Sequence, residues 1–259
     1  MTTTTRDGDL WLRTTCANVH AGCPAIPDES VDLMVTSPPY KKRDKFTPDL
    51  MAALGKLASR VLKPDGRLWV NFGQLSEDFQ RSVDVPTQIR AGSPALELGQ
   101  TVIWAKSISI GETSHGHLQP ISSPRIMSYC WEFIYQLHKG DPRDLDRLAI
   151  GVPFMDKSNL TRGNRGKNGD LRCAGDLWFI PYETTGPSKK KKHQYEFPAD
   201  VARRCIRVSN LEPQSVVLDP FGGSGQVAAV AKEEGHHAWT VEFNPEHLVM
   251  ATARWKHAK

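Results

Sequence analysis

The chain has 259 residues, of which 39% are hydrophobic, and its 33 Lys and Arg residues exceed its 29 Asp and Glu residues by only four. This content is enough for a buried core, but no apolar stretch approaches the roughly 18 residues that span a bilayer. The five cysteines include no C-x-x-C pair, which argues against a disulfide framework and a zinc site. The Thr-rich start lacks the apolar core of a signal peptide, so we expect a soluble, cytoplasmic protein.

The first half of the chain alternates strand-like and helix-like patterns. The periodicity of apolar residues predicts strands at 31–35, 67–72, 99–104 and 131–137 and a helix at 50–62. The first strand runs into the sequence T-S-P-P-Y at 36–40, whose two prolines stop it. Lys63–Gly66 reads as the turn that ends the helix.

The second half contains an irregular stretch followed by regular elements. Residues 139–195 lack sustained periodicity, and we interpret them as an inserted lobe rather than part of the sheet, including the short apolar run at 176–180. Beyond them we predict a helix at 198–208, a strand at 215–218, a helix from 227 to about 234, a strand at 238–241 and a last helix through Trp255. One α/β domain with an insertion follows from this order.

A glycine-rich loop, D-P-F-G-G-S-G at 219–225, follows the strand at 215–218. Glycines let backbone amides approach a ligand without an intervening Cβ, and the next helix presents its positive end there. Glu242 ends the following strand, where a carboxylate can accept both hydroxyls of a ribose. Loop, helix, strand and acid predict a nucleoside-binding half, although the loop by itself could be a tight turn. No Walker lysine follows it, which argues against nucleotide hydrolysis.

The T-S-P-P-Y loop has groups suited to holding an amine. Pro38 and Pro39 have no N–H donors, and both the Ser37 hydroxyl and the Pro38 carbonyl can accept from one exocyclic NH2 group. Tyr40 can stack on the base that carries this group; the alternative is an ordinary strand-ending turn. Since both loops follow strands of one parallel sheet, we expect them to meet at its carboxyl edge. This arrangement indicates group transfer onto an amino nitrogen.

Basic residues gather in the irregular stretch, where Gly, Asn and Ser are frequent. They are Arg162, Arg165, Lys167, Arg172, Lys189, Lys190, Lys191 and Lys192. A local cluster of this kind is the electrostatic footprint that a polyanion needs, and the alternative is a solvated surface.

Together, T-S-P-P-Y, the glycine loop and Glu242 resemble motif IV, motif I and the motif II acid of the S-adenosylmethionine-dependent amino-DNA methyltransferases, in the permuted order of the β group. Segments at 28–33, 61–66, 131–140 and 193–206 are also similar to that family, so the resemblance covers nearly the whole chain. It implies an α/β methyltransferase (Rossmann-like) fold with a mostly parallel seven-stranded sheet, helices on both faces and an inserted target-recognition lobe. The implied units are a catalytic half at 1–138, the lobe at 139–192 and a cofactor-binding half at 193–259 that forms one structural domain with 1–138.

The resemblance also implies ligands and site residues. The cofactor would be S-adenosylmethionine, the substrate double-stranded DNA, and no metal is expected. The implied catalytic residues are Ser37, Pro38, Pro39 and Tyr40; the cofactor residues are Asn18, Phe197, Asp219, Pro220, Phe221, Gly222, Gly223, Ser224, Gly225 and Glu242; and the basic cluster would bind DNA. A cognate restriction endonuclease is a further expectation, as is a monomer or homodimer. Gln226 departs from the family's usual Thr, and Ala17-Asn18 from its usual Gly-Asp pair.

Several functions fit this resemblance. Ser before Pro-Pro-Tyr favours cytosine N4 as the methylated atom, whereas the adenine-N6 relatives usually have Asp there. A DNA-binding protein with the same fold and no activity is a second alternative, which the intact Ser37, Tyr40, Asp219 and Glu242 argue against. RNA and protein-glutamine methylation fit less well. Cys23-Pro24 reverses the order that a cytosine-C5 nucleophile needs, so we interpret Cys23 as structural.

Overall fold

The computed structural model describes residues 1–39, 47–75, 78–117, 123–157, 170–182 and 197–259. Nine strands form its main sheet: β1 (Thr2–Asp7), β2 (Leu10–Cys16), β3 (Val31–Thr36), β4 (Leu62–Phe72), β5 (Leu96–Ala105), β8 (Trp131–Lys139), β11 (Leu177–Phe179), β12 (Val216–Asp219) and β13 (His237–Glu242). Their order is β1-β2-β13-β12-β3-β4-β8-β5-β11. Adjacent strands from β2 to β4 are parallel, β8 is antiparallel to both β4 and β5, β1 is antiparallel to β2, and β11 is parallel to β5.

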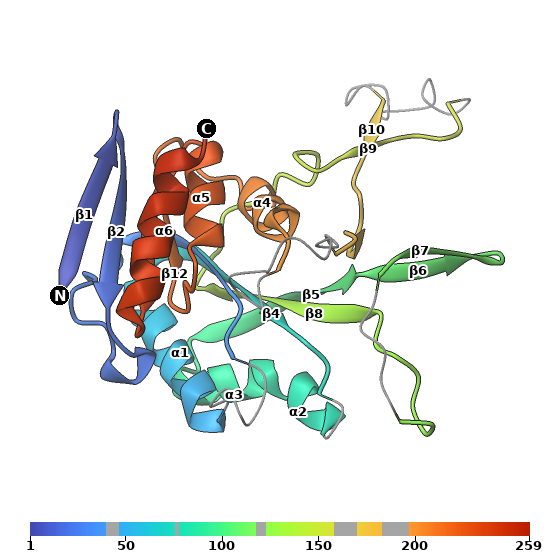
Figure 1. Ribbon diagram of the computed structural model, residues 1–259, viewed down its shortest axis with the longest axis horizontal. Coiled ribbons are helices and arrows are strands. Elements are labelled where there is room, and N and C mark those ends of the chain that lie inside the picture. The colour runs from blue at the N-terminus through green and yellow to red at the C-terminus, as the bar shows by residue number, and fades with distance from the viewer. Residues whose placement is uncertain (40–46, 76–77, 118–122, 158–169, 183–196) are drawn as a thin grey trace.

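Helices cover both faces of this sheet (Figure 1). They are α1 (Pro48–Val61), α2 (Phe79–Val83), α3 (Val85–Gly92), α4 (Ala199–Val208), α5 (Gln226–Glu233) and α6 (Pro245–His257). In β4, Leu68 and Val70 belong to the core that α1 and α3 complete, while Trp69 belongs to the core of α4, α5 and α6. Because successive side chains of a strand point to opposite faces, each face has its own helical layer.

The predicted elements form, with boundaries shifted by a few residues, and the mostly parallel sheet is confirmed. The predicted strand count was wrong: the described residues form a main sheet of nine strands, not seven. β1 and β2 were not predicted, and they extend the sheet beyond β13. The apolar run at 176–180 was placed outside the sheet, but its residues 177–179 form β11 against the edge of β5. The predicted turn at 63–66 lies within β4, whose pairing with β3 shifts register nearby.

Two small strand pairs extend away from the main body on the right of Figure 1. One is the hairpin of β6 (Ser107–Ile110) and β7 (Thr113–Gly116), and the other pairs β9 (Val152–Pro153) with β10 (Leu171–Arg172). Arg172, on β10, is exposed. The other members of the predicted basic cluster lie outside the described residues: Arg162, Arg165, Lys167, Lys189, Lys190, Lys191 and Lys192.

None of the helices in the described residues is long and apolar enough to cross a membrane. All five cysteines are free thiols. Cys23 is buried in the core beside α1, and burial raises the pKa of its thiol. This placement agrees with the structural role expected for Cys23.

Candidate active site

The predicted motifs meet at the carboxyl edge of the sheet because the strands before them are parallel. Thr36 is the last residue of β3, Asp219 the last of β12 and Glu242 the last of β13. β2 ends beside β13, with Cys16 opposite Glu242. In open α/β folds this edge is where ligands bind.

A direct bond joins the T-S-P-P-Y sequence to the glycine loop. The Thr36 hydroxyl donates to Asp219 Oδ1 at 2.6 Å, and the Phe221 backbone N–H donates to the same oxygen at 3.0 Å. Asp219 is only 5% exposed, and this burial raises the pKa of its carboxyl to about 7, although the two hydrogen bonds act in the opposite direction. Among the described residues, no Lys, Arg or His forms an ion pair with Asp219.

Two glycines of the loop are required by the packing of the protein itself. A Cβ on Gly222 would lie 2.1 Å from the Thr240 side chain on β13. Gly225 has a φ of +81°, and a Cβ there would lie 2.6 Å from Ala251 on α6. The loop therefore sits directly against β13 and α6, which brings its backbone to the edge where Glu242 lies.

Glu242 links the glycine loop to the start of α6. Its Oε2 accepts the Gly223 backbone N–H at 3.0 Å, and its Oε1 accepts the Asn244 N–H at 2.9 Å. The backbone oxygen of Glu242 accepts from the Ala17 N–H at 3.2 Å, so Asn18 follows at the same edge. The Asn18 side chain is exposed and accepts from the His20 N–H, which caps the 3-10 turn that follows.

The T-S-P-P-Y residues after Thr36 are described as far as Pro39. Pro38 is buried, whereas Ser37 and Pro39 are partly buried. The Ser37 hydroxyl donates to Asn71 Oδ1, on β4, at 3.4 Å. Tyr40, the predicted stacking residue, lies outside the described residues.

The remaining predicted cofactor residues lie in the glycine loop itself or in the helical layer behind it. Pro220 and Ser224 are buried, and Phe221 is partly buried against the core of α1 and α3. Phe197 is buried in the other core, just before α4. Gln226, which replaces the family's usual Thr, accepts from the Arg254 guanidinium at 2.6 Å and so ties α5 to α6.

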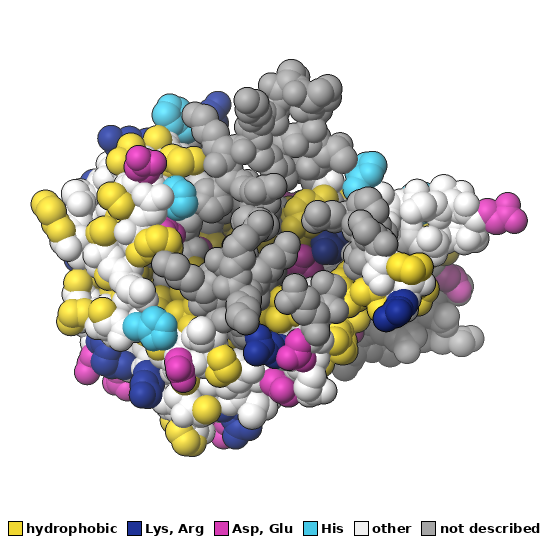
Figure 2. Space-filling view, turned by 60° about the horizontal axis from the view of Figure 1, so that its bottom comes forward, with side chains coloured by type: hydrophobic (Ala, Val, Ile, Leu, Met, Phe, Trp, Pro, Cys, Tyr) yellow, Lys and Arg dark blue, Asp and Glu magenta, His cyan; other side chains and the backbone are white. Residues whose placement is uncertain are grey.

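Charges of both signs are interspersed on the described surface shown in Figure 2, where no basic area is formed by described side chains. The described residues contain no group of three or more His, Cys, Asp and Glu that could hold a metal ion.

Sequence reasoning missed the two polar partners that hold the motifs. Thr36 was named within T-S-P-P-Y but given no role, and Asn71 was not singled out. A polar residue near the carboxyl end of a buried apolar strand was the available signal for Asn71, since such positions face the ligand edge of a parallel sheet.

Comparisons with known proteins agree with this geometry. The model of the DNA methylase family, N6_N4_Mtase, matches residues 31–253. The type II methyltransferase M.ScaI of Streptomyces caespitosus is 26% identical over 249 residues, which cover 89% of this chain and 76% of that protein. M.BglII of Bacillus subtilis is 27% identical over 243 residues, covering 87% and 64% of the respective chains.

Solved structures share the fold at lower identity. The PvuII DNA methyltransferase, described as cytosine-N4-specific, has a TM-score of 0.68 at 19% identity, with 94% of this chain and 86% of that chain covered. TTHA0409 of Thermus thermophilus, in a complex with S-adenosyl-L-methionine, has a TM-score of 0.65 at 22% identity, with 95% of each chain covered. These likenesses confirm the α/β methyltransferase fold, and because the family match spans most of its length, the chain belongs to the DNA methylase family of N6 and N4 amino-methyltransferases.

Proposed function

We propose that this protein transfers a methyl group from S-adenosylmethionine to the exocyclic N4 of cytosine in double-stranded DNA. The bond between Thr36 and Asp219 carries the proposal, because it brings the amine-accepting loop and the glycine loop to one point. Attack by the amino nitrogen on a methyl group needs these two loops side by side, since the catalysis consists mainly of positioning. The target base would leave the duplex to reach Ser37.

The residues at this edge fit S-adenosylmethionine, whose sulfonium supplies an electrophilic methyl group when it is bound. The Asp219 carboxyl is buried without a cation from the described residues, so a positively charged ligand would complete its surroundings. Glu242 ends β13 with its carboxylate beside the Gly223 backbone, where its remaining lone pairs can accept from ribose hydroxyls. TTHA0409, which shares the fold, was solved with this cofactor.

Ser37 supports cytosine rather than adenine as the target. It offers a neutral hydroxyl where the adenine-modifying relatives usually offer a carboxylate, and the fold neighbour from the PvuII system is described as cytosine-N4-specific. Adenine N6 is the second candidate, because its amine presents the same donors to the same acceptors.

The modified nucleoside identifies the reaction. We expect the purified protein to form N4-methylcytosine when incubated with S-adenosylmethionine and unmodified bacterial genomic DNA, measured by mass spectrometry of the digested DNA. Ser37→Ala should lower the rate about a hundredfold while the affinity for the cofactor stays unchanged, because the lost acceptor faces the base. Detection of N6-methyladenine without N4-methylcytosine would change the assigned target base from cytosine to adenine. Detection of no methylated nucleoside at all would contradict the proposal.

We further propose that the lobe at 139–192 supplies DNA contacts through its basic residues. The support is the local density of charge in the sequence and the exposure of Arg172 on β10. Replacing Lys189–Lys192 by Gln should weaken binding to all sequences alike and reduce the salt dependence by a slope of roughly 0.9 for each lost phosphate contact. An unchanged slope would identify these lysines as solvated surface.

A further inference from the structure

A row of polar side chains leads from Ser37 into the interior of the protein. Asn71, near the end of β4, donates from Nδ2 to Glu132 Oε2 at 3.0 Å and to the Phe133 backbone oxygen at 3.1 Å. Glu132 Oε1 in turn lies 3.0 Å from Lys106 Nζ. Because β8 is antiparallel to β4, its first residues lie at the carboxyl edge, which places Glu132 behind the candidate active site.

The part of this row beyond Ser37 is shielded from water. Asn71 and Glu132 are buried, and the Lys106 side chain is only 13% exposed. Lys106 Nζ also lies 5.7 Å from the centre of the Tyr182 ring, and burial together with the charge of Glu132 raises the pKa of that tyrosine. In such surroundings a carboxylate needs a cation and hydrogen-bond donors close by, and Lys106 and Asn71 supply them.

The partners of Asn71 determine which way its amide faces. Its NH2 group donates to two acceptors, one of them a carboxylate, so a flipped amide would direct its oxygen at both. Asn71 Oδ1 therefore faces Ser37, whose hydroxyl donates to it. A hydroxyl has a single hydrogen, and once this hydrogen is donated inward the oxygen can meet a substrate only as an acceptor.

We propose that Glu132 and Lys106 are positioning residues: they fix the amide of Asn71 and thereby hold the Ser37 hydroxyl as an acceptor for the amino group of the target base. This inference rests on the proposed function, since it assigns the residues that set the polarity of the same site. Neither residue touches the substrate, and both act through Asn71.

The substitution Glu132→Gln directly tests whether Glu132 fixes the orientation of the Asn71 amide. In this variant Asn71 and Lys106 compete for one amide oxygen, and the remaining NH2 group of the glutamine opposes one of them. We expect kcat to fall about tenfold to a hundredfold, as for other losses of positioning, with the dissociation constant for S-adenosylmethionine unchanged. The rate is measured with labelled S-adenosylmethionine and unmodified bacterial genomic DNA, and the affinity by calorimetry.

The double variant Glu132→Gln with Lys106→Met separates positioning from mere stability. Removing Lys106 ends the competition, so the glutamine oxygen can again accept from Asn71, and we expect kcat to rise above that of Glu132→Gln alone. Lys106→Met by itself removes the ion pair that Lys106 forms with the Glu132 carboxylate and should be slower than the double variant. Thermal melting of each variant identifies any that fail to fold, and the neutral double variant provides a test even if Lys106→Met is among them.

A matched control lies at the other end of β8. Lys139 forms an ion pair with Glu29 at 2.8 Å, and Lys139→Met should leave kcat unchanged. A wild-type rate in Glu132→Gln, or a double variant slower than Glu132→Gln, would overturn this inference but leave the proposed function in place. A wild-type protein that methylates no DNA would overturn the proposed function and the inference with it.

Discussion

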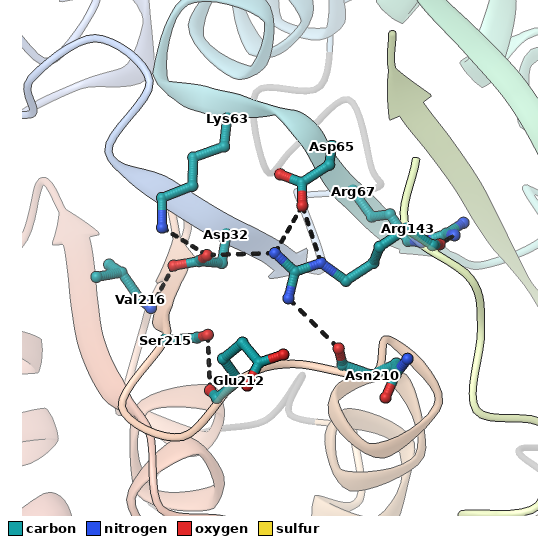
Figure 3. Close-up of polar contacts among 9 residues, drawn as sticks. All are labelled: Asp32, Lys63, Asp65, Arg67, Arg143, Asn210, Glu212, Ser215 and Val216. Atoms are coloured by element: carbon teal, nitrogen blue, oxygen red, sulfur yellow. Dashed lines mark hydrogen bonds and ion pairs between the residues drawn. The ribbon is translucent and has the colours of Figure 1, made fainter. Parts of the chain in front are cut away.

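The parallel strands have a buried acid at their amino ends, called the amino edge here, and another at their carboxyl edge, but the two acids have different partners. At the amino edge, Asp32 Oδ1 lies 2.7 Å from Lys63 Nζ and 3.8 Å from the Arg143 guanidinium, and Oδ2 accepts from the Val216 N–H (Figure 3). At the carboxyl edge, Asp219 is held by a hydroxyl and a backbone N–H. From this difference we expect Asp32 to stabilise the fold and Asp219 to receive the positively charged ligand proposed above.

The amino edge also connects distant parts of the chain. Arg143 follows β8 and contacts Asp65, near the start of β4, at 2.7 Å, and its guanidinium donates to the Asn210 backbone oxygen after α4. These contacts tie the segment that leaves the sheet after β8 to two layers of the fold (Figure 3). We therefore expect changes at the amino edge to affect stability, and changes at the carboxyl edge to affect ligand binding.

The largest effect on stability should come from Asp32→Ala. It leaves the Val216 N–H and the Lys63 ammonium without their acceptor, and it removes the 3.8 Å contact of Arg143, which keeps its pair with Asp65. Because Lys63 and Arg143 are partly exposed and solvent screens them, we expect a loss of about 2 kcal/mol in the free energy of unfolding, less than for a fully buried pair. Urea unfolding measures this loss. Asp32→Asn, which retains an oxygen for Val216, serves as control and should lose less; equal stability of Asp32→Ala and the wild type would remove the distinction between the edges.

The next effect is a pH dependence of cofactor affinity. The pKa of Asp219 is raised to about 7, and a positive ligand favours its ionised form. Affinity for S-adenosylmethionine should therefore rise about tenfold between pH 6 and pH 8, and Asp219→Asn should flatten this profile. Calorimetric titration at several pH values checks it. A parallel rise in the Asn variant would assign the dependence to another group.

The same pKa fixes the sign of a stability change in the ligand-free protein. The folded state retains the Asp219 proton up to about pH 7, whereas the unfolded chain loses it near pH 4. The contribution of this group to stability is therefore fully present below about pH 4 and is lost as the pH rises through 7. Comparing the wild type with Asp219→Asn isolates it from the other titrating groups.

A smaller change is expected from Thr36→Val. The Thr36 hydroxyl lowers the pKa of Asp219 against the larger effect of burial, so its removal should move the midpoint of the affinity profile to higher pH. At pH 7 we expect affinity to fall by about a few-fold. Thr36→Ser keeps the hydroxyl and should keep the midpoint; a shift in the Ser variant as large as in the Val variant would indicate a packing effect.

The smallest effect should come from Asp65→Asn at the amino edge. Asp65 pairs with Arg143, but its side chain is 38% exposed. Solvent-exposed pairs contribute little, so we expect less than about 1 kcal/mol in urea unfolding. If Asp65→Asn lost as much free energy of unfolding as Asp32→Ala, the contacts of Arg143, rather than the burial of Asp32, would account for the stability at this edge.

Much of the site was predictable because its motifs are local. The apolar runs before Thr36 and Asp219 identify parallel strands, and parallel strands bring the loops that follow them to one edge whatever else the chain does. The predicted helices were also local, since the spacing of apolar residues in α1 records which face it buries. Fold class, the ligand edge and the positions of both loops follow from these patterns.

Other features depended on partners far away in the chain. β11 has only three residues, too few for a distinct period, and the edge of β5 makes it a strand. Likewise β2 joins the sheet through β13, more than 200 residues later. The row from Ser37 through Asn71 and Glu132 to Lys106 draws on segments around four different strands. Local sequence records burial and spacing, whereas hydrogen bonds between such segments exist only after tertiary packing has set their register.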